Sequence, residues 1–335
     1  MAPTPRVSVL IPTYNYGRYL PEAIESVLAQ EFGDFELILS DDASTDGSAD
    51  IVHRYAGRDA RIRACVRPAN IGMVAHWNWC LRQARGEYLK FLFGDDRLAG
   101  PAALGRWVRL LDEQPSAVLA VGARRIIDED SRPTDVWDHL AENGLYDGRH
   151  VVRQCLFATH NFLGEPTATL IRTRAAARGF DPRYRQMVDL EMWCHLLLAG
   201  DLVHTDEVLC EFRRHPEQQT VLNRRQPMAG REYAWLVRDY FPRCVPAGYR
   251  LSATERWHLV LSLIHNRTAW REIPEMAPVR RSLVALVGRG AYARLWAQYR
   301  VARPFGNLRR TWRKYVRREK TESQRPVFGV RMRKS

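Results

Sequence analysis

The sequence of 335 residues lacks several patterns that mark common classes of protein. No stretch approaches the ~20 consecutive apolar residues that a membrane-spanning helix needs. The first residues pass from a short polar leader into a strand-like run, without the apolar stretch of a signal peptide. We therefore expect a cytoplasmic protein. The six cysteines form no C-x-x-C pair, so we expect reduced thiols rather than a zinc site or a disulfide framework.

Lysine is scarce, and the basic charge is unevenly distributed. The formal net charge is +13, but residues 301–335 alone carry 12 Lys and Arg against two acidic residues, Glu319 and Glu322. The rest of the chain is therefore close to neutral. An arginine-rich tail raises the possibility of nucleic-acid binding. We do not expect that function, because the sequence contains no helix-turn-helix, zinc-finger or RNP-like motif.

Strand-like and helix-like patterns alternate over the first 125 residues. Such alternation predicts an α/β fold with a mostly parallel sheet between helices. Further strands and one helix are expected after a polar, turn-rich stretch at 126–147. The predicted strands are 6–11, 35–40, 62–66, 87–93, 117–121, 165–171 and 207–212, and the predicted helices are 19–30, 49–55, 72–85, 102–111 and 189–199. We expect one domain at 1–220, with halves at 6–125 and 126–220, then a helical region at 221–302 and a basic tail at 303–335.

Polar residues follow three of the predicted strands, in the segments PTYN, DDAST and GDDR. In parallel sheets, ligands gather at the carboxyl ends of the strands. Asp95 and Asp96 can hold a hard divalent cation, Mg²⁺ or Mn²⁺, which would neutralise a diphosphate. Asp42 can accept a hydrogen bond from a nucleobase, and Tyr14 can pack against one. The alternative for each segment is an ordinary loop that caps the following helix.

The chain resembles the family 2 glycosyltransferases over residues 6–125. The match is carried by VSVLIPTYN, then FELILSDDASTDGS, then NIGMVAHWNWCLRQARGEYLKFLFGDD. The resemblance implies a GT-A fold, a nucleotide-sugar donor and an inverting reaction. It also implies roles for individual residues, with Asp96 as the metal ligand, Asp95 beside it, and nucleotide contacts at Pro12, Tyr14, Asn15 and Asp42.

Two positions depart from the family pattern. Phe93 stands where the family often has the first residue of an Asp-x-Asp motif. Protein ligation of the metal is therefore expected to rest on Asp96, helped by Asp95. The family also often has an Arg-Asn pair in the helix after its Asn-x-Gly, and that stretch here is His76-Trp77-Asn78. The donor-phosphate contact usually given to such an arginine thus has no counterpart.

Two later segments extend the resemblance. QMVDLEMWCHLLLAGD is similar to the segment that carries the family's catalytic base, so we expect Asp189 to take the acceptor's proton. Val188 replaces the family's Glu, and Glu191 is the alternative base. EFRRHPEQQT resembles a stretch near the donor diphosphate, which indicates Arg214 and His215. A lone histidine is often structural, so that role for His215 stays open.

The sequence therefore predicts an inverting transferase of a hexosyl or deoxyhexosyl group. The donor would be a nucleotide-diphosphate sugar, and the acceptor a saccharide or lipid-linked hydroxyl in surface polysaccharide or glycolipid assembly. A Rossmann dehydrogenase is excluded, because PTYNYGRY follows the first strand where G-x-G-x-x-G would be required. A non-catalytic relative is the other alternative. The presence of Asp42, Asp96 and Asp189 argues against it.

The basic tail interleaves aromatic residues with arginines, for example Trp312 and Tyr315 between Arg309 and Arg318. Such a mixture suits the headgroup layer of an anionic membrane. We expect the tail to bind the inner membrane face, where a lipid-linked acceptor would lie. The alternative is a solvated tail whose arginines reflect codon usage.

Overall fold

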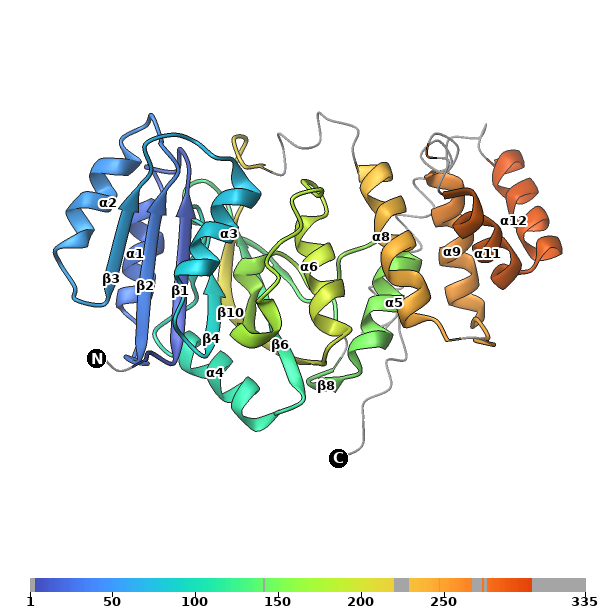
Figure 1. Cartoon of the computed structure of the whole chain (residues 1–335), viewed down its shortest axis with the longest axis horizontal. Helices are drawn as coiled ribbons and strands as arrows, with labels where there is room; N and C mark the ends of the chain where they lie inside the picture. The colour runs from blue at the N-terminus through green and yellow to red at the C-terminus, as the bar shows by residue number, and fades with distance from the viewer. Residues whose placement is uncertain are drawn as a thin grey trace. The chain divides into compact units, whose positions relative to one another are not determined.

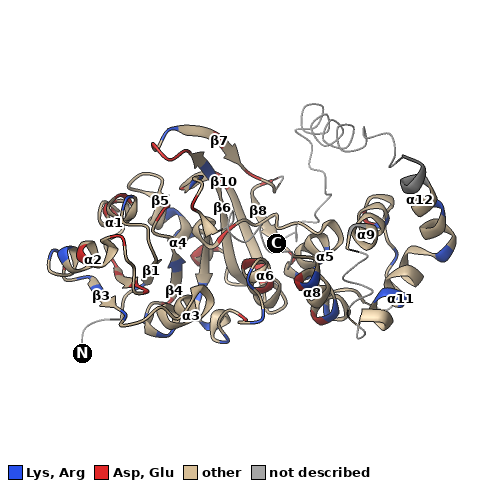
Figure 2. Cartoon of the chain, turned by 90° about the horizontal axis from the view of Figure 1, so that it is seen from above, with Lys and Arg blue, Asp and Glu red and all other residues tan. Residues whose placement is uncertain are grey.

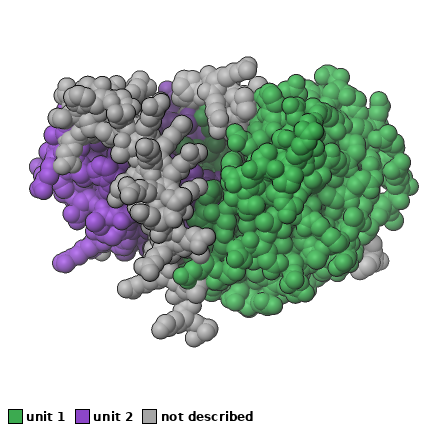
Figure 3. Space-filling view, turned by 180° about the vertical axis from the view of Figure 1, so that it is seen from behind, with its two compact units in different colours: residues 1–148, 163–226, 332–335 green, residues 149–162, 227–331 purple. Residues whose placement is uncertain are grey.

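The computed structural model describes residues 4–140, 142–219, 229–246, 248–266, 273 and 276–302. The chain divides into two compact units, shown in different colours in Figure 3. The described residues of 1–148 and 163–226 form unit 1, and those of 149–162 and 227–331 form unit 2. Residues 149–162 thus belong to the second unit, although the sequence placed them in the first domain. The tail at 303–335 lies outside the described residues.

Unit 1 is built on a sheet with the strand order β3-β2-β1-β4-β9-β6-β10-β5. Two further strands are attached to it, since β7 pairs with β6 and β8 pairs with β10. The strands are β1 (Val7–Thr13), β2 (Phe35–Asp41), β3 (Ile62–Val66), β4 (Tyr88–Phe91), β5 (Arg97–Leu98), β6 (Ala117–Ile127), β7 (Pro133–Trp137), β8 (Gly144–Tyr146), β9 (Thr169–Arg172) and β10 (Asp201–Arg213).

Helices connect these strands and flank the sheet, as Figure 1 shows. Every strand and helix predicted before residue 125 is present, with ends that differ by a few residues. The predicted α/β class is therefore confirmed. The helices of unit 1 are α1 (Leu20–Leu28), α2 (Ser48–Ala56), α3 (Met73–Gln83), α4 (Ala103–Glu113) and α6 (Val188–Leu197), with short 3₁₀ turns η1 (Pro166–Ala168) and η2 (Thr173–Ala176) around β9.

The sheet is mixed, and its strand directions bring distant segments to one edge. Strands β3, β2, β1 and β4 are parallel, as predicted. Strand β9 runs antiparallel to β4 and β6, and β10 is parallel to β6. Consequently β9 begins, and β10 ends, at the edge of the sheet where β1, β2 and β4 end. Residues on either side of these strand ends can therefore meet.

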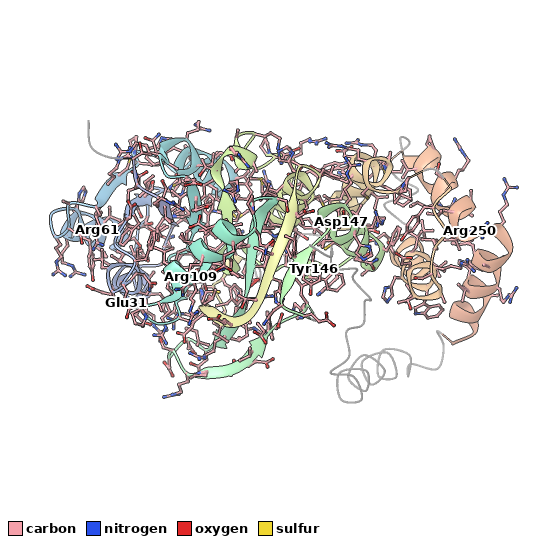
Figure 4. All side chains as sticks on the ribbon, turned by 90° about the horizontal axis from the view of Figure 1, so that it is seen from below. Glu31, Arg61, Arg109, Tyr146, Asp147 and Arg250 are labelled. Atoms are coloured by element: carbon pink, nitrogen blue, oxygen red, sulfur yellow. The ribbon has the colours of Figure 1, made fainter. Side chains whose placement is uncertain are left out.

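The core of unit 1 lies between the sheet and its helices, and side chains fill that space (Figure 4). Val9 of β1 packs in one buried cluster with Ile24 of α1 and Trp107 of α4. Burying each such side chain contributes ~1.5–3 kcal/mol. All six cysteines are free, and five of them are buried. Basic and acidic residues are interspersed along the ribbon of both units (Figure 2).

Unit 2 is helical in its described part. Its helices are α5 (Gly148–Ala158), α8 (Ala229–Cys244), α9 (Ala253–His265), α11 (Met276–Val287) and α12 (Arg289–Ala302). The buried Tyr233 of α8 joins three of them, because its hydroxyl donates to the Leu156 carbonyl of α5 and accepts from Ser262 of α9 at 2.6 Å. Across the described residues, we find no helix that combines the length and the apolarity of a membrane span.

Candidate active site

The segments that follow β1 and β2 are locked together by Asn15. This residue has a left-handed backbone (φ 56°), which Asn tolerates better than most residues. Its N–H donates to Ser44 Oγ at 2.9 Å, and its side-chain oxygen accepts from the Thr45 N–H at 2.9 Å. The neighbouring Tyr14 is 46% exposed, whereas Pro12 is buried inside β1. Of these predicted nucleotide-binding residues, Tyr14 and Asn15 are therefore exposed, and Pro12 is not.

Asp42 lies at the end of β2 and is 2% exposed. Its carboxylate accepts hydrogen bonds from the N–H groups of Ile71 and Gly72, each at 3.1 Å from one of its oxygens. Its own N–H donates to the Thr13 carbonyl at 3.0 Å. Asp42 thus joins the ends of β1 and β2 to the segment that starts α3. A carboxylate has about four lone-pair sites, so acceptor capacity remains for a base.

Asp96 is held on both carboxylate oxygens. Oδ1 accepts from the Arg213 N–H at 2.9 Å, and Oδ2 accepts from the Thr167 hydroxyl at the start of β9. The side chain is 1% exposed. Burial raises the pKa of Asp96 well above its usual range, and the charge of Asp95 raises it further. Asp96 therefore fastens the turn after β4 to β9 and β10.

Asp95 faces a different partner, His215, which lies 120 residues further along the chain. His215 Nε2 is 3.1 Å from Asp95 Oδ2, and the rings of Tyr16 and Tyr19 pack against the imidazole with centroids 5.8 and 5.1 Å away. The backbone N–H of His215 donates to Gln218 Oε1 at 3.1 Å. A carboxylate oxygen and an imidazole nitrogen are thus held side by side at the sheet edge.

Burial also affects Tyr16. Desolvation raises the pKa of its phenol well above the usual value, and the neighbouring charges of Asp95 and Asp96 act in the same direction. The hydroxyl therefore stays protonated and serves as a donor beside Asp95. Gly94 leaves room for this segment, because a Cβ there would lie 2.8 Å from Thr13 Oγ1 and 3.3 Å from Tyr16 Cβ.

The two arginines of the RRH segment have opposite environments. Arg213 is fully buried, and its Nε donates to the Asp95 carbonyl at 2.8 Å while Nη2 pairs with Glu22 at 2.9 Å. Arg214 is exposed, and its guanidinium lies over the Trp137 ring, 5.9 Å from the centroid. The structure therefore does not bring Arg214 into the Asp95–His215 cluster, although the sequence pointed to it. Arg213 is the arginine that supports this cluster.

Two polar atoms at the same edge have no hydrogen-bond partner in the part of the chain that the structure describes. They are Thr13 Oγ1 and Asp41 Oδ1, and both side chains are at most 1% exposed. Buried polar atoms are almost always paired, so these two are suited to a ligand group or an ordered water. They lie at the ends of β1 and β2, beside the predicted nucleotide residues.

The two candidate bases on α6 differ in accessibility. Asp189 lies half-buried in the first turn, and its Oδ1 accepts from the Leu190 N–H at 2.7 Å. Glu191 is 1% exposed and forms a bidentate ion pair with Arg178, with distances of 2.7 and 2.6 Å. Glu191 is thus buried with both oxygens paired to Arg178, whereas Asp189 is partly accessible to solvent.

Sequence reasoning missed Thr167, Tyr16 and Arg213. One signal was available for Arg213, since side chains alternate along a strand and His215 lies two positions away. Glu211, Arg213 and His215 are all buried, while Arg214 faces outward. No local signal identifies Thr167, because its partner Asp96 lies 71 residues earlier in the chain.

Comparison with known proteins identifies the class of this chain as a glycosyltransferase. The model of the family described as Glycosyl transferase family 2 matches residues 8–180, about half of the chain. The chain belongs to this family. It is 30% identical over 212 residues to TuaG of Bacillus subtilis (strain 168), a glycosyltransferase assigned by its name to teichuronic acid biosynthesis. That match covers 62% of this chain and 79% of TuaG.

Solved structures show the same fold. TarS of S. aureus (residues 1–349), in complex with UDP-GlcNAc, has a TM-score of 0.58 at 17% identity, covering 85% of this chain and 82% of that one. The mannosyltransferase PcManGT of Pyrobaculum calidifontis, in complex with GDP-Man and Mn²⁺, has a TM-score of 0.54 at 18% identity, covering 93% and 84%. The GT-A fold expected from the sequence is confirmed.

Proposed function

We propose that this family 2 glycosyltransferase moves a hexosyl or deoxyhexosyl group from a nucleotide-diphosphate sugar to an acceptor hydroxyl, with inversion. The observation that carries the proposal is the pairing of Asp95 with His215 at 3.1 Å, on the sheet edge that also holds Asp42. TarS and PcManGT were solved with the nucleotide sugars UDP-GlcNAc and GDP-Man, and the name of TuaG supports a role in surface polysaccharide or glycolipid assembly.

Asp95 and His215 fit a divalent cation, Mn²⁺ or Mg²⁺. Their oxygen and nitrogen can serve as ligands, and the donor's diphosphate oxygens would complete the coordination. The imidazole favours Mn²⁺, because Mg²⁺ prefers oxygen ligands. When bound, the cation would neutralise charge on the departing diphosphate. Among the residues that the structure describes, no group of three or more His, Cys, Asp or Glu is placed to hold a metal.

Asp96, expected from the sequence to bind the metal, receives a supporting role in this proposal. Its two oxygens accept hydrogen bonds from Arg213 and Thr167, so it fixes the turn that presents Asp95. Asp42 and Tyr14 keep their expected roles at the nucleotide, whereas Pro12 and Asn15, also expected to contact it, support the loop in this proposal. Asp42 would accept from the base, Tyr14 would pack against it, and Pro12 and Asn15 would shape the loop beneath it.

Asp189 would act as the base. Its carboxylate takes the proton of the acceptor hydroxyl as that oxygen attacks the anomeric carbon. The bond between this carbon and the diphosphate breaks on the opposite side, so the configuration inverts and the nucleoside diphosphate leaves. Glu191 does not take part, because Arg178 holds both of its oxygens. The basic tail at 303–335 would bring the enzyme to an anionic membrane surface that carries a lipid-linked acceptor.

A thermal-shift screen of UDP, dTDP, GDP and CDP, each with and without Mn²⁺, tests the proposal. A ligand at 100 times its Kd adds ~2.7 kcal/mol to stability, which raises the midpoint by several degrees. We expect one nucleotide to stabilise the protein in a Mn²⁺-dependent manner. The matching sugar donor should then release this nucleotide when an acceptor is added. Failure of all four nucleotides to shift the midpoint would contradict the proposal.

A further inference from the structure

The two positions that depart from the family pattern lie against each other. Trp77 of α3 and Phe93, just after β4, have ring centroids 4.7 Å apart and ring planes inclined by 28°, a stacked pair. The sequence pattern of the family often has an arginine and an aspartate at these positions. In this chain, two charged groups are thus replaced together by one aromatic surface, here called the aromatic wall.

The aromatic wall is supported from behind by the core. Trp77 also contacts Phe180 edge-on, with centroids 5.3 Å apart, and Phe91 at 6.5 Å. Phe91 is fully buried and Phe180 is 2% exposed, whereas Trp77 and Phe93 are only half-buried. One side of the pair is therefore packed, and part of the other side meets solvent.

The position of the aromatic wall links the proposed metal ligand to the proposed base. The Phe93 carbonyl accepts from the Asp96 N–H at 3.0 Å, so Phe93 belongs to the turn that presents Asp95. Phe180 is tied to α3 by two hydrogen bonds with the Asn78 side chain, at 2.7 and 2.8 Å. The ion pair between residues 178 and 191 joins the same loop to the first turns of α6.

The donor sugar must lie between the group that holds its diphosphate and the base that activates the acceptor. Phe93 lies in the turn that carries Asp95, and Trp77 contacts Phe180 on the loop that is joined to α6, so the aromatic wall is the surface we assign to this space. Stacked aromatic faces accept CH groups, but they offer no acceptor to a sugar hydroxyl. A hydroxyl pressed against them loses its bond to water, while a methyl group gains from leaving water.

Resting on the function proposed above, we propose that the aromatic wall of Trp77 and Phe93 receives the apolar edge of the donor sugar and selects a 6-deoxyhexose. The C6 methyl group of such a sugar packs against the rings. The hydroxymethyl group of an ordinary hexose exchanges its hydrogen bonds with water for ring faces that offer its hydroxyl no acceptor. The selection comes from the sugar and not from the nucleotide, because Asp42 and the loops after β1 and β2 serve the base.

The test compares donors that share a base and differ only in the oxygen on C6. These are the UDP, dTDP and CDP derivatives of glucose and 6-deoxyglucose, together with GDP-D-mannose and GDP-D-rhamnose. Binding is measured by titration calorimetry with Mn²⁺. For the pair with the correct base, we expect the deoxy donor to bind more tightly by between about 4-fold, the value of one buried methylene-sized group, and about 100-fold. The free nucleoside diphosphate provides the reference.

Variants separate this role from a structural one. Trp77→Ala and Phe93→Ala should each bring the ratio of the two Kd values close to one, while binding of the free nucleoside diphosphate stays within a factor of two or so. Trp77→Phe keeps a ring and should keep the preference. Trp257→Ala, at a 39% exposed tryptophan of unit 2, is the matched control and should leave the ratio unchanged.

Three outcomes would overturn the inference. Equal binding of both donors by the unaltered protein, or tighter binding of the hydroxylated one, removes the proposed selection. If Trp77→Ala weakens binding of the free nucleoside diphosphate as much as binding of the sugar donor, the aromatic wall contacts the nucleoside and not the sugar. Failure to bind any nucleoside diphosphate refutes the proposed function, and the inference with it.

Discussion

Asp95→Asn and Asp96→Asn should differ strongly in their effect on metal-dependent nucleotide binding, although the two aspartates are adjacent. In Asp95→Asn, the side chain beside His215 loses its charge, and the amide is a poor metal ligand. Asp96→Asn makes the same exchange one residue later, at a carboxyl whose pKa is raised by burial. The amide oxygen can still accept from the Arg213 N–H, and the Thr167 hydroxyl can turn to accept from the amide nitrogen. The two variants are therefore matched controls for each other.

The contacts of Asp95 and Asp96 determine how strongly each substitution should weaken nucleotide binding. Groups that only support a metal ligand typically change affinity by ~10–100-fold, so loss of a direct ligand should weaken metal-dependent nucleotide binding by at least ~100-fold. Asp96 supports the turn rather than the metal, and its variant should stay within ~10-fold of the unaltered protein. Its stability should change by no more than ~1–2 kcal/mol, since both hydrogen bonds can be re-formed.

The assay is calorimetric titration of the stabilising nucleoside diphosphate into each variant, with and without Mn²⁺. Mn²⁺ should strengthen binding to the unaltered protein and to Asp96→Asn, but not to Asp95→Asn. His215→Ala should resemble Asp95→Asn. If Asp96→Asn alone loses the effect of Mn²⁺, the metal ligand is Asp96, as the sequence suggested, and the argument from its occupied oxygens is wrong.

Three further predictions follow from individual side chains. Asp189→Asn should lower turnover by ~10²–10⁴-fold and leave nucleotide binding intact. Glu191→Gln breaks the ion pair with Arg178 and should lower the urea midpoint of unfolding instead. If Glu191→Gln loses turnover and Asp189→Asn keeps it, Glu191 is the base. Burial lowers the pKa of Lys90 from 10.5 to about 7, so between these pH values the unfolded chain binds one more proton than the folded chain. The free energy of unfolding should therefore rise with pH across this window, by up to about 5 kcal/mol relative to Lys90→Met. A difference between the two proteins that does not change with pH would contradict this. A chain shortened before residue 303 should lose co-sedimentation with anionic vesicles but keep transfer to a soluble acceptor, whereas equal sedimentation of both chains would refute membrane binding by the tail.

The sequence could predict the nucleotide half of the fold because its signals are local. Each strand from β1 to β4 is short and mostly apolar, and a Pro, Asp or Gly lies at its end or within three residues after it, so the positions of Asp42 and Asp95 near strand ends follow directly. Parallel strands then place those ends on one edge. The position of Asp189 at the start of a helix followed from the same kind of local pattern.

Other features depend on contacts that no local pattern encodes. Strand β7 has four exposed residues out of five, so its sequence lacks the alternation of a half-buried strand. Helix α5 and strand β8 lie in or next to a stretch dominated by turn residues. The antiparallel direction of β9, which brings Thr167 to Asp96, arises from pairing with β4 and β6. The choice between Arg213 and Arg214 depends on which face of β10 is buried.

The alternation at the end of β10 also limits how this enzyme can be recombined with its relatives. Arg213 and His215 face the site only while the register of β10 against β6 is kept, and one inserted or deleted residue between them would turn the imidazole away from Asp95. A hybrid that takes helices α8 to α12 from another glycosyltransferase should therefore be joined beyond Gln218, whose side chain accepts from the His215 backbone N–H. A joint placed inside β10 could keep every residue type of the site and still shift the register of β10, which would move His215 away from Asp95.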